Sequence, residues 1–335
     1  MPRIDIEALE DEWEEDHHLL TRRSRDLSVA ARERIDALDI ARVVGVDRGR
    51  VTIVDRGEIM EARFAGTMRG EKAAVGDRVK VRPAKHPGDE PRIVEVLPRD
   101  TVLTRTADDT DDTERVVVAN ADQIVIVVAA DHLDVGTRFL DRVLVAASLG
   151  GVEPFLCINK RDLIDDDAEV AEVAEVAEVI DRYEAIGVPV RVTSAATGEG
   201  MDALERLLAG CWTAFTGHSG VGKSSLFNRL IPGASQTIGE LGRYGGRHTT
   251  VAAWALEAPG LDAWLVDTPG VRSFGLGSLA PEELGRHFPE LAALRCRLDD
   301  CTHSGEPGCQ LAEAEIHPSR LAAFERLRAS LAEGR

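Results

Sequence analysis

The hydrophobic pattern divides the chain into segments of different character. Residues 1–39 are rich in charge and poor in apolar runs, which predicts an extended or partly helical arm. Between 40 and 98, turn residues separate short β-rich runs. Five short strands of this kind predict a small closed barrel of the OB type, whose open face commonly binds nucleic acid. A barrel that merely packs on its neighbour is the alternative. The five runs are ARVVGV, RVTIVD, EIMEARF, DRVKVR and RIVEVL.

The pattern over residues 101–280 is that of an α/β domain. QIVIVVAA, which begins at Gln123, is a continuous apolar run, as a buried parallel strand requires. A helix is expected next, at RFLDRVLVAASLGG, and the AEV repeat predicts a second, solvated helix without chemistry. Residues 281–335 are expected to be helical again, interrupted by a cysteine cluster. Further strands are predicted at EPFLCINK, VPVRVTSA, WTAFTG and DAWLVDTPG.

Charge and cysteine content indicate which partners and which cellular compartment the protein can have. The net charge of −19 argues against a nucleic-acid partner, but residues 41–105 carry 14 basic and 10 acidic side chains. The acidic, charged N-terminus is not expected to be a signal peptide, and five cysteines then favour a reducing, cytoplasmic location over a disulfide framework. No run approaches the roughly 18 apolar residues of a membrane span, so no membrane partner is expected.

The motif GHSGVGKS, from Gly217 to Ser224, predicts a phosphate-binding loop between a strand and a helix. Its glycines let backbone N–H groups turn toward phosphate oxygens, Lys223 reaches the β and γ phosphates, and the Ser224 hydroxyl ligates magnesium. Alone, the motif also suits an ATP site. The expected nucleotide contacts are Gly217, His218, Ser219, Gly220, Val221, Gly222, Lys223, Ser224 and Ser225.

The motif DTPG, from Asp267 to Gly270, follows a predicted strand. Asp267 is expected to hold magnesium, and the Gly270 N–H to reach the γ-phosphate. Between the two motifs lies a glycine-rich loop in which Thr249 or Thr250 can supply a switch hydroxyl to magnesium. The alternative for this loop is a plain surface excursion.

The motif NKRD, from Asn159 to Asp162, predicts guanine specificity. The Asp162 carboxylate can accept hydrogen bonds from guanine N1 and N2, which adenine does not offer. Asn159 is expected to brace the loop and Lys160 to cover the base. Ser194 and Ala195, in TSA on the next strand end, are expected to add a backbone N–H for the guanine carbonyl.

The order of these motifs is unusual, because the guanine motif precedes the phosphate loop. Each motif acts from the carboxyl end of a strand, so only its place in the sheet matters. Chain termini often lie close together, and joining them while cutting elsewhere can leave a site intact. The sequence therefore predicts a circularly permuted GTPase domain, with GTP or GDP as ligand and magnesium as its companion ion.

Cys296, Cys301, His303 and Cys309 form a compact set of metal-ligand residues. Three thiolates and one imidazole predict one closed, tetrahedral, structural zinc site per chain. Three buried thiols and a surface histidine are the alternative, but the surrounding loop is too polar to bury cysteines unaided.

Taken together, the barrel, the permuted motifs NKRD, TSA, GHSGVGKSSLFN, RHTT and DTPGVRSFGL, and the cluster CTHSGEPGC resemble the RsgA (YjeQ) family of bacterial GTPases. The likeness covers about residues 40–310. It implies late maturation of the small ribosomal subunit, binding to its rRNA, and GTP hydrolysis linked to release. A monomer is expected.

The catalytic group is expected to differ from that of Ras-type GTPases. Val271 occupies the position where those enzymes carry a water-orienting glutamine, and valine cannot orient water. His248, beside the switch threonines, is the candidate substitute, and a solvated loop histidine is its alternative. Two other functions stay open at this point: a GTP-controlled binding protein with negligible turnover and a protein partner, and an RNA-binding module with a vestigial nucleotide site.

Overall fold

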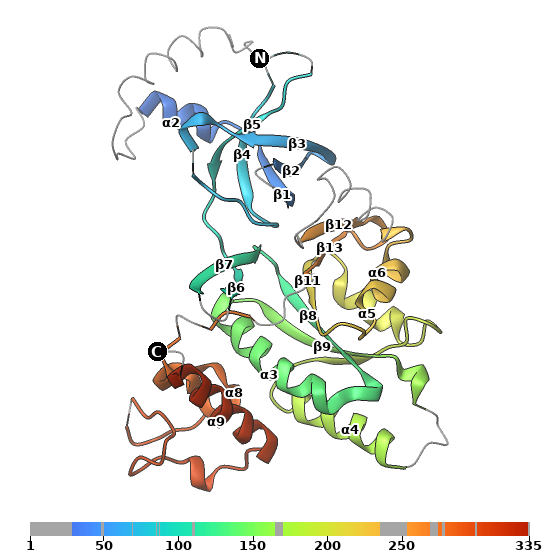
Figure 1. Ribbon diagram of the computed structural model, residues 1–335, viewed down its shortest axis with the longest axis vertical. Helices are drawn as coiled ribbons and strands as arrows, with labels where there is room; N and C mark the ends of the chain where they lie inside the picture. Colours follow the sequence, from blue (N-terminus) through green and yellow to red (C-terminus); the bar gives the residue numbers. More distant parts are fainter. Residues whose placement is uncertain are drawn as a thin grey trace.

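The computed structural model describes residues 29–333, apart from 48–49, 69, 85, 87, 109–110, 165–169, 235–252, 269–273, 277–278 and 299. Figure 1 shows three parts along the long axis of the molecule. A small barrel occupies one end, a sheet with helices on its two faces lies in the middle, and the C-terminal helices lie beside α3 (Leu133–Gly150). The first 28 residues of the predicted arm lie outside the described residues.

Five strands close on themselves to form the barrel. β1 pairs with β2, β2 with β3, β3 with β5, β5 with β4, and β4 returns to β1. The β3–β5 pair is parallel and the others are antiparallel, which is the arrangement of a five-stranded barrel of the OB type. The predicted barrel is therefore confirmed. Its strands are β1 (Ile40–Asp47), β2 (Arg50–Asp55), β3 (Glu58–Phe64), β4 (Arg78–Arg82) and β5 (Arg92–Val96).

Local sequence explains how the barrel closes. Between β2 and β3, Arg56 and Gly57 have φ values of 50° and 85°, as a tight two-residue hairpin turn requires. Helix α2 (Val29–Asp36) covers one end of the barrel, where Ile35 is buried and Lys80 Nζ donates to two carbonyls at 2.9 and 2.6 Å. The barrel core includes the fully buried Val43, Ile53, Val79 and Ile93.

A β-hairpin that the sequence pattern does not predict connects the barrel to the rest of the chain. Its strands are β6 (Val102–Asp108) and β7 (Asp111–Ala119). The barrel loop ahead of β4 is fixed to this hairpin, because Ala119 N donates to the Val75 carbonyl at 2.8 Å. Gly76 is required there, since a Cβ would lie 1.9 Å from the Ala119 carbonyl oxygen. The barrel is thus held at a fixed place against the hairpin.

The central sheet has the strand order β10-β9-β8-β11-β13-β12, with β12 antiparallel to β13 and the other neighbours parallel. Alternate residues of β8 face two hydrophobic cores, one with α3 and α4 and the other with α5 and α6. The strands are β8 (Gln123–Ala129), β9 (Glu153–Asn159), β10 (Val190–Val192), β11 (Trp212–Thr216), β12 (Trp254–Ala258) and β13 (Ala263–Asp267). The remaining helices are α4 (Val170–Glu184), α5 (Met201–Leu208) and α6 (Lys223–Leu230).

The chain does not trace this sheet from one edge to the other. It builds β8, β9 and β10 outward to one edge, returns to place β11 beside β8, and then adds β12 and β13 on the far side. The strand that carries the phosphate-loop motif is consequently central, with the guanine-motif strands already in place on one flank. This is the arrangement that circular permutation predicts.

The barrel also extends the central sheet along the free edge of β12. Gly45 of β1 pairs with Trp254 of β12, and a Cβ at Gly45 would lie 2.1 Å from the Trp254 ring. Farther along β1, the Arg42 guanidinium stacks 3.6 Å from the centroid of the Trp212 ring, and burial lowers the pKa of Arg42 to about 10. The barrel and the sheet are therefore packed as one body.

The C-terminal helices dock on α3 through a buried charge network. Arg320 donates to Asp141 of α3 at 2.5 Å and to Glu290 at 2.6 Å, and its side chain is 3% exposed. Phe288 and Phe324 pack edge to face at 5.5 Å in the same core. The segment is formed by η6 (Pro281–His287), α8 (Pro289–Ala292), η7 (Leu311–Glu313) and α9 (Pro318–Glu333).

Candidate nucleotide site and metal centre

The loop predicted to bind phosphate lies between the end of β11 and the start of α6. Neighbouring atoms leave no room for a side chain at two of its glycines. A Cβ at Gly217 would lie 2.3 Å from the Val127 carbonyl oxygen, and one at Gly222 would lie 2.3 Å from Asn159 Nδ2. Close packing therefore holds the loop against β8 and against the end of β9.

Lys223, the first residue of α6, directs its ammonium back over this loop. Its Nζ donates to the Gly217 carbonyl at 2.6 Å and to the His218 carbonyl at 3.0 Å. Burial lowers the pKa of Lys223, and the negative charge of Asp267 offsets part of that effect. The next two residues, Ser224 and Ser225, are exposed, so a ligand at this end of the helix can reach them.

Asp267 ends β13 beside β11, in register with Phe215. Burial raises the pKa of its carboxyl, and the charge of Lys223 lowers it. Its Oδ1 is buried and has no hydrogen-bond partner in the part of the chain that the structure describes. Such an oxygen is costly to leave unsatisfied, and a hydrated magnesium ion prefers oxygen ligands of this kind. Ser224 and Asp267 therefore fit the magnesium that accompanies a nucleotide.

Asn159 joins three strand ends at the same edge of the sheet. It is 1% exposed. Its Nδ2 donates to the Val221 carbonyl of the phosphate loop at 3.0 Å, and its Oδ1 accepts from Ala195 N at 3.1 Å and from Thr193 Oγ1 at 3.2 Å. The NKRD loop, the TSA turn and the phosphate loop are thus cross-linked through one side chain.

Asp162 lies at the outer side of this junction and is exposed, as a residue that reads a base must be. Ser194 Oγ donates to Asp162 Oδ1, which orients the carboxylate. Lys160 has a left-handed backbone with φ 65°, and its Nζ lies 4.0 Å from Asp131 Oδ2. The Ala195 N–H is expected to donate to the guanine carbonyl. In this structure it donates to Asn159 Oδ1, so a hydrogen bond to a base would have to share the same N–H.

Five of the residues singled out from the sequence lie outside the described residues. They are His248, Thr249, Thr250, Gly270 and Val271. The described chain resumes at Ala253 ahead of β12 and at Phe274 after the DTPG motif.

The four candidate metal ligands of the C-terminal segment converge, with their ligand atoms all within 4.8 Å of one another. His303 Nδ1 lies 3.7, 3.8 and 3.6 Å from the sulfur atoms of Cys296, Cys301 and Cys309. A tetrahedral zinc site with usual bond lengths separates nitrogen from sulfur by about 3.6 Å. Burial lowers the pKa of His303, which favours the neutral, ligating form of its ring. The set therefore fits a metal such as zinc.

The comparisons with known proteins agree with this geometry. The sequence model described as RsgA GTPase matches residues 96–277. The Small ribosomal subunit biogenesis GTPase RsgA of Ectopseudomonas mendocina is 40% identical over 266 residues, which cover 77% of this chain and 75% of that protein. Its counterpart from Gemmatimonas aurantiaca is 37% identical, with 80% of this chain and 91% of that protein covered.

The chain belongs to the RsgA GTPase family.

Two solved structures extend the likeness to the whole fold of the RsgA GTPase family. YjeQ from Thermotoga maritima superimposes with a TM-score of 0.71 at 31% identity, covering 88% of this chain and 98% of that one. YloQ, described as a circularly permuted GTPase, superimposes with a TM-score of 0.68 over 89% of this chain and 96% of its own, and at 24% identity it supports the fold alone. This RsgA GTPase family member is therefore a GTP-hydrolysing enzyme with a circularly permuted domain.

One contact at the RsgA-type site could not be found from sequence. Phe139 of α3 packs against the His218 ring of the phosphate loop, with ring centroids 4.7 Å apart, and against Phe274 at 6.4 Å. Phe274 is fully buried, and its carbonyl accepts from Arg142 Nε at 3.0 Å. In the sequence Phe139 is one apolar position of an amphipathic helix, a pattern that signals core packing only.

Within the described residues, the helices are too short or too polar to cross a lipid bilayer.

Proposed function

We propose that this GTPase binds the small ribosomal subunit and assists its late maturation, and that the subunit stimulates hydrolysis, which is linked to release. The names of the relatives, small ribosomal subunit biogenesis GTPases, support the partner. The observation that carries the nucleotide half of the proposal is the convergence of three motifs through the buried Asn159 side chain. A phosphate group and a guanine base can then be held at fixed places along one sheet edge.

The nucleotide contacts follow from that edge. Asp162, oriented by Ser194, accepts from the guanine N1 and N2 groups, and the Lys160 stem covers the base. Lys223 exchanges its two loop carbonyls for phosphate oxygens when a nucleotide enters. The remaining contacts are assigned to Asn159, Ala195, Gly217, His218, Ser219, Gly220, Val221, Gly222, Ser224, Ser225, Asp267 and Gly270.

Magnesium is assigned to Ser224 and Asp267, joined by Thr249 or Thr250 when the γ-phosphate is present. Magnesium supplies positive charge that stabilises the developing negative charge on the transferred phosphoryl group. Residues at three strand ends hold the phosphate groups and the metal ion in place before the reaction, so few protein groups have to move as it proceeds.

His248 is assigned the role of holding the attacking water, because Val271 takes the place of the usual glutamine. His248→Ala is expected to lower subunit-stimulated turnover by at least tenfold while GTP affinity stays within about twofold. Single-turnover hydrolysis and equilibrium nucleotide binding measure the two quantities. Full stimulated activity in His248→Ala would remove this histidine from the mechanism.

The division of labour between the parts is also proposed. The barrel (40–98) contacts rRNA, the GTPase domain (101–280) binds nucleotide, and the C-terminal segment (281–335) holds one structural zinc per chain on Cys296, Cys301, His303 and Cys309. We also propose that the protein acts as a monomer in the cytoplasm, where the thiols of this set stay reduced.

Co-sedimentation with small ribosomal subunits tests the role of the barrel. Lys72 and Arg92 are exposed barrel cations, and Arg206 on α5 is an exposed cation of the GTPase domain. The double variant Lys72→Glu/Arg92→Glu should bind subunits more weakly and with a shallower salt dependence, because backbone phosphates dominate such binding. Arg206→Glu is the matched control. Equal binding by both variants would place the rRNA-binding surface outside the barrel.

A further inference from the structure

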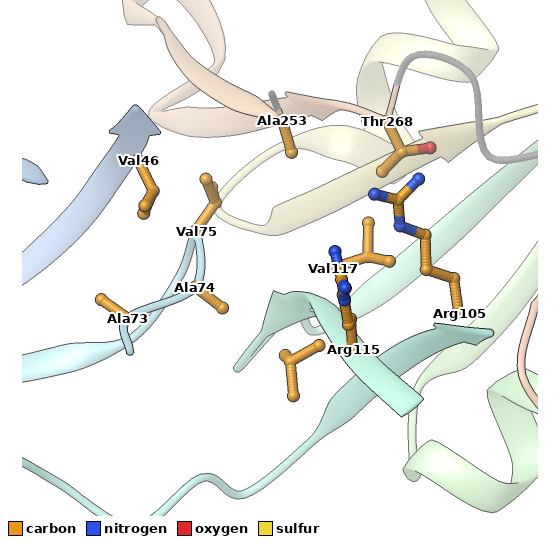
Figure 2. Close-up of a pocket in the computed structure, with 10 residues that line it drawn as sticks. Val46, Ala73, Ala74, Val75, Arg105, Arg115, Val117, Ala253 and Thr268 are labelled. Atoms are coloured by element: carbon orange, nitrogen blue, oxygen red, sulfur yellow. The ribbon is translucent and has the colours of Figure 1, made fainter. Parts of the chain in front are cut away.

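A cavity of about 180 Å³ lies where the barrel, the β6–β7 hairpin and the central sheet meet. Val46 and Val75 line it from the barrel side, Arg105 and Arg115 from the hairpin, and Thr268 from the end of β13. Figure 2 shows both arginine side chains rising from the hairpin into this space, with the Arg105 guanidinium directed toward Thr268. The volume is several times the roughly 30 Å³ that one water molecule occupies in the liquid.

Among the described residues that line the cavity, the two charged side chains are both cations. Arg105 and Arg115 are directly opposite each other in the antiparallel β6–β7 pair. Like charges in that position repel, so the arrangement costs stability unless an anion lies between or beside them. No acidic side chain is among the described residues that line the cavity, and no hydrogen bond or ion pair joins either guanidinium to another described residue.

The other walls are small and apolar, and they are fixed in place. Ala73, Ala74 and Val75 belong to the barrel loop that is hydrogen-bonded to the hairpin, and Asp77 secures that loop by accepting from Ala74 N at 2.7 Å. Arg99 pairs with the same carboxylate at 2.7 Å. Arg105 is half-buried and Arg115 is exposed, so a ligand from solvent can reach both guanidinium groups.

We propose that this cavity binds a phosphate group, held by the guanidinium groups of Arg105 and Arg115. Arginine presents paired donors that match the oxygens of a phosphate, and two of them facing one space supply the charge that a phosphate monoanion or dianion requires. The source is either a backbone phosphate of RNA or free inorganic phosphate, since both offer the same oxygens to this pair.

The location gives the site a consequence for the enzyme. Thr268 directly follows the magnesium candidate Asp267, and its Oγ1 donates to the Phe215 carbonyl of β11 at 2.7 Å. A phosphate in the cavity would therefore contact the barrel, the hairpin and the strand end that carries the DTPG motif at once. The inference goes beyond the proposed function, because phosphate can bind here whether or not the small subunit stimulates hydrolysis.

Two probes distinguish the sources in the full-length protein, with the nucleotide site filled by a slowly hydrolysed GTP analogue. Broadening of the ³¹P signal of inorganic phosphate reports free phosphate. Fluorescence anisotropy of a labelled oligouridylate of about 16 nucleotides, titrated at several salt concentrations, reports RNA backbone binding. The variants are R105Q/R115Q and each single substitution, and R206Q on the exposed face of α5 is the matched control.

The double variant should lose at least tenfold in affinity for one or both probes, and each single variant should lose less. Because three variants are compared, the test still holds if one of them does not fold. Loss with inorganic phosphate alone identifies free phosphate as the ligand. Loss with the oligouridylate, together with a salt dependence shallower by about 0.7 per lost contact, identifies RNA backbone phosphate. If both probes bind R105Q/R115Q as they bind R206Q, the proposal is wrong.

Discussion

Asn159→Ala removes the side chain that joins the guanine motif, the TSA turn and the phosphate loop. The wild-type amide makes hydrogen bonds to Val221, Ala195 and Thr193 at 3.0 to 3.2 Å, and it is 1% exposed. Alanine cannot make these bonds, and water has little room to replace them. We therefore expect losses both in the free energy of unfolding and in nucleotide affinity.

The magnitude follows from which partners are left unsatisfied. Thr193 Oγ1 keeps a second partner in the Cys157 sulfur, 3.3 Å away, so its loss is small. The Val221 carbonyl and the Ala195 N–H lose the amide that bonds them, and each unsatisfied buried group costs about 1–3 kcal/mol. Because Ala195 is only half-buried, its N–H contributes the lower end of that range, and the free energy of unfolding should fall by about 2–4 kcal/mol. If half of that free energy, about 1–2 kcal/mol, is also lost from nucleotide binding, GDP affinity falls by about 5- to 30-fold.

Urea unfolding and calorimetric GDP binding measure the two losses. Asn159→Asp is the matched variant, because it keeps the acceptor toward Ala195 but sets a carboxylate oxygen against the Val221 carbonyl. Its nucleotide affinity should fall at least as far as that of Asn159→Ala. A change below about 0.5 kcal/mol in unfolding, with GDP affinity within about twofold of wild type, would refute the account of Asn159 as the cross-link.

The remaining predictions concern the base, the thiols and the C-terminal dock. Asp162→Asn should weaken GTP binding and improve xanthosine triphosphate binding in calorimetry, because xanthine offers a carbonyl where guanine has an amine; unchanged GTP affinity would contradict the assignment. Burial raises the pKa of Cys157 to about 12, so mass spectrometry after iodoacetamide treatment of the native protein should find it unmodified. The cluster cysteines should become reactive only after a chelator removes about one zinc per chain, and equal labelling without chelator would speak against bound metal. Arg320→Met should cost about 3–5 kcal/mol in urea unfolding because it leaves Asp141 and Glu290 buried without their partner. The half-exposed Arg326, 3.6 Å from Asp141, is the control, and Arg326→Met should cost less than about 1 kcal/mol; equal losses would show that the buried network does not anchor the segment.

Much of the architecture could be predicted because its signals are local. The five β-rich runs between turn residues predict all five barrel strands, and the Arg56–Gly57 turn has the backbone that such a hairpin needs. The continuous apolar run of β8 likewise predicts a strand buried on both faces, and its residues do alternate between two cores. The permuted order was readable because each motif carries its own chemistry whatever its place in the chain.

Other features depend on tertiary structure and have weaker local signals. The hairpin of β6 and β7 interrupts its apolar pattern with charge, and β12 is a short strand that follows a glycine-rich loop. Both are stabilised by neighbours far along the chain, as the Gly45–Trp254 contact shows for β12. The Asn159–Ala195 hydrogen bond also depends on how two loops meet, so the sequence could suggest a bracing role for Asn159 but not its partner.

The most direct test of the central claim is GTP turnover by the full-length protein with and without small ribosomal subunits. The account predicts slow hydrolysis by the free enzyme and an increase of at least a hundredfold at saturating subunits, since a partner that orders a switch loop can add several powers of ten. Large ribosomal subunits at the same concentration should give no comparable increase. A free enzyme already at the stimulated rate, or equal stimulation by both subunits, would contradict the account.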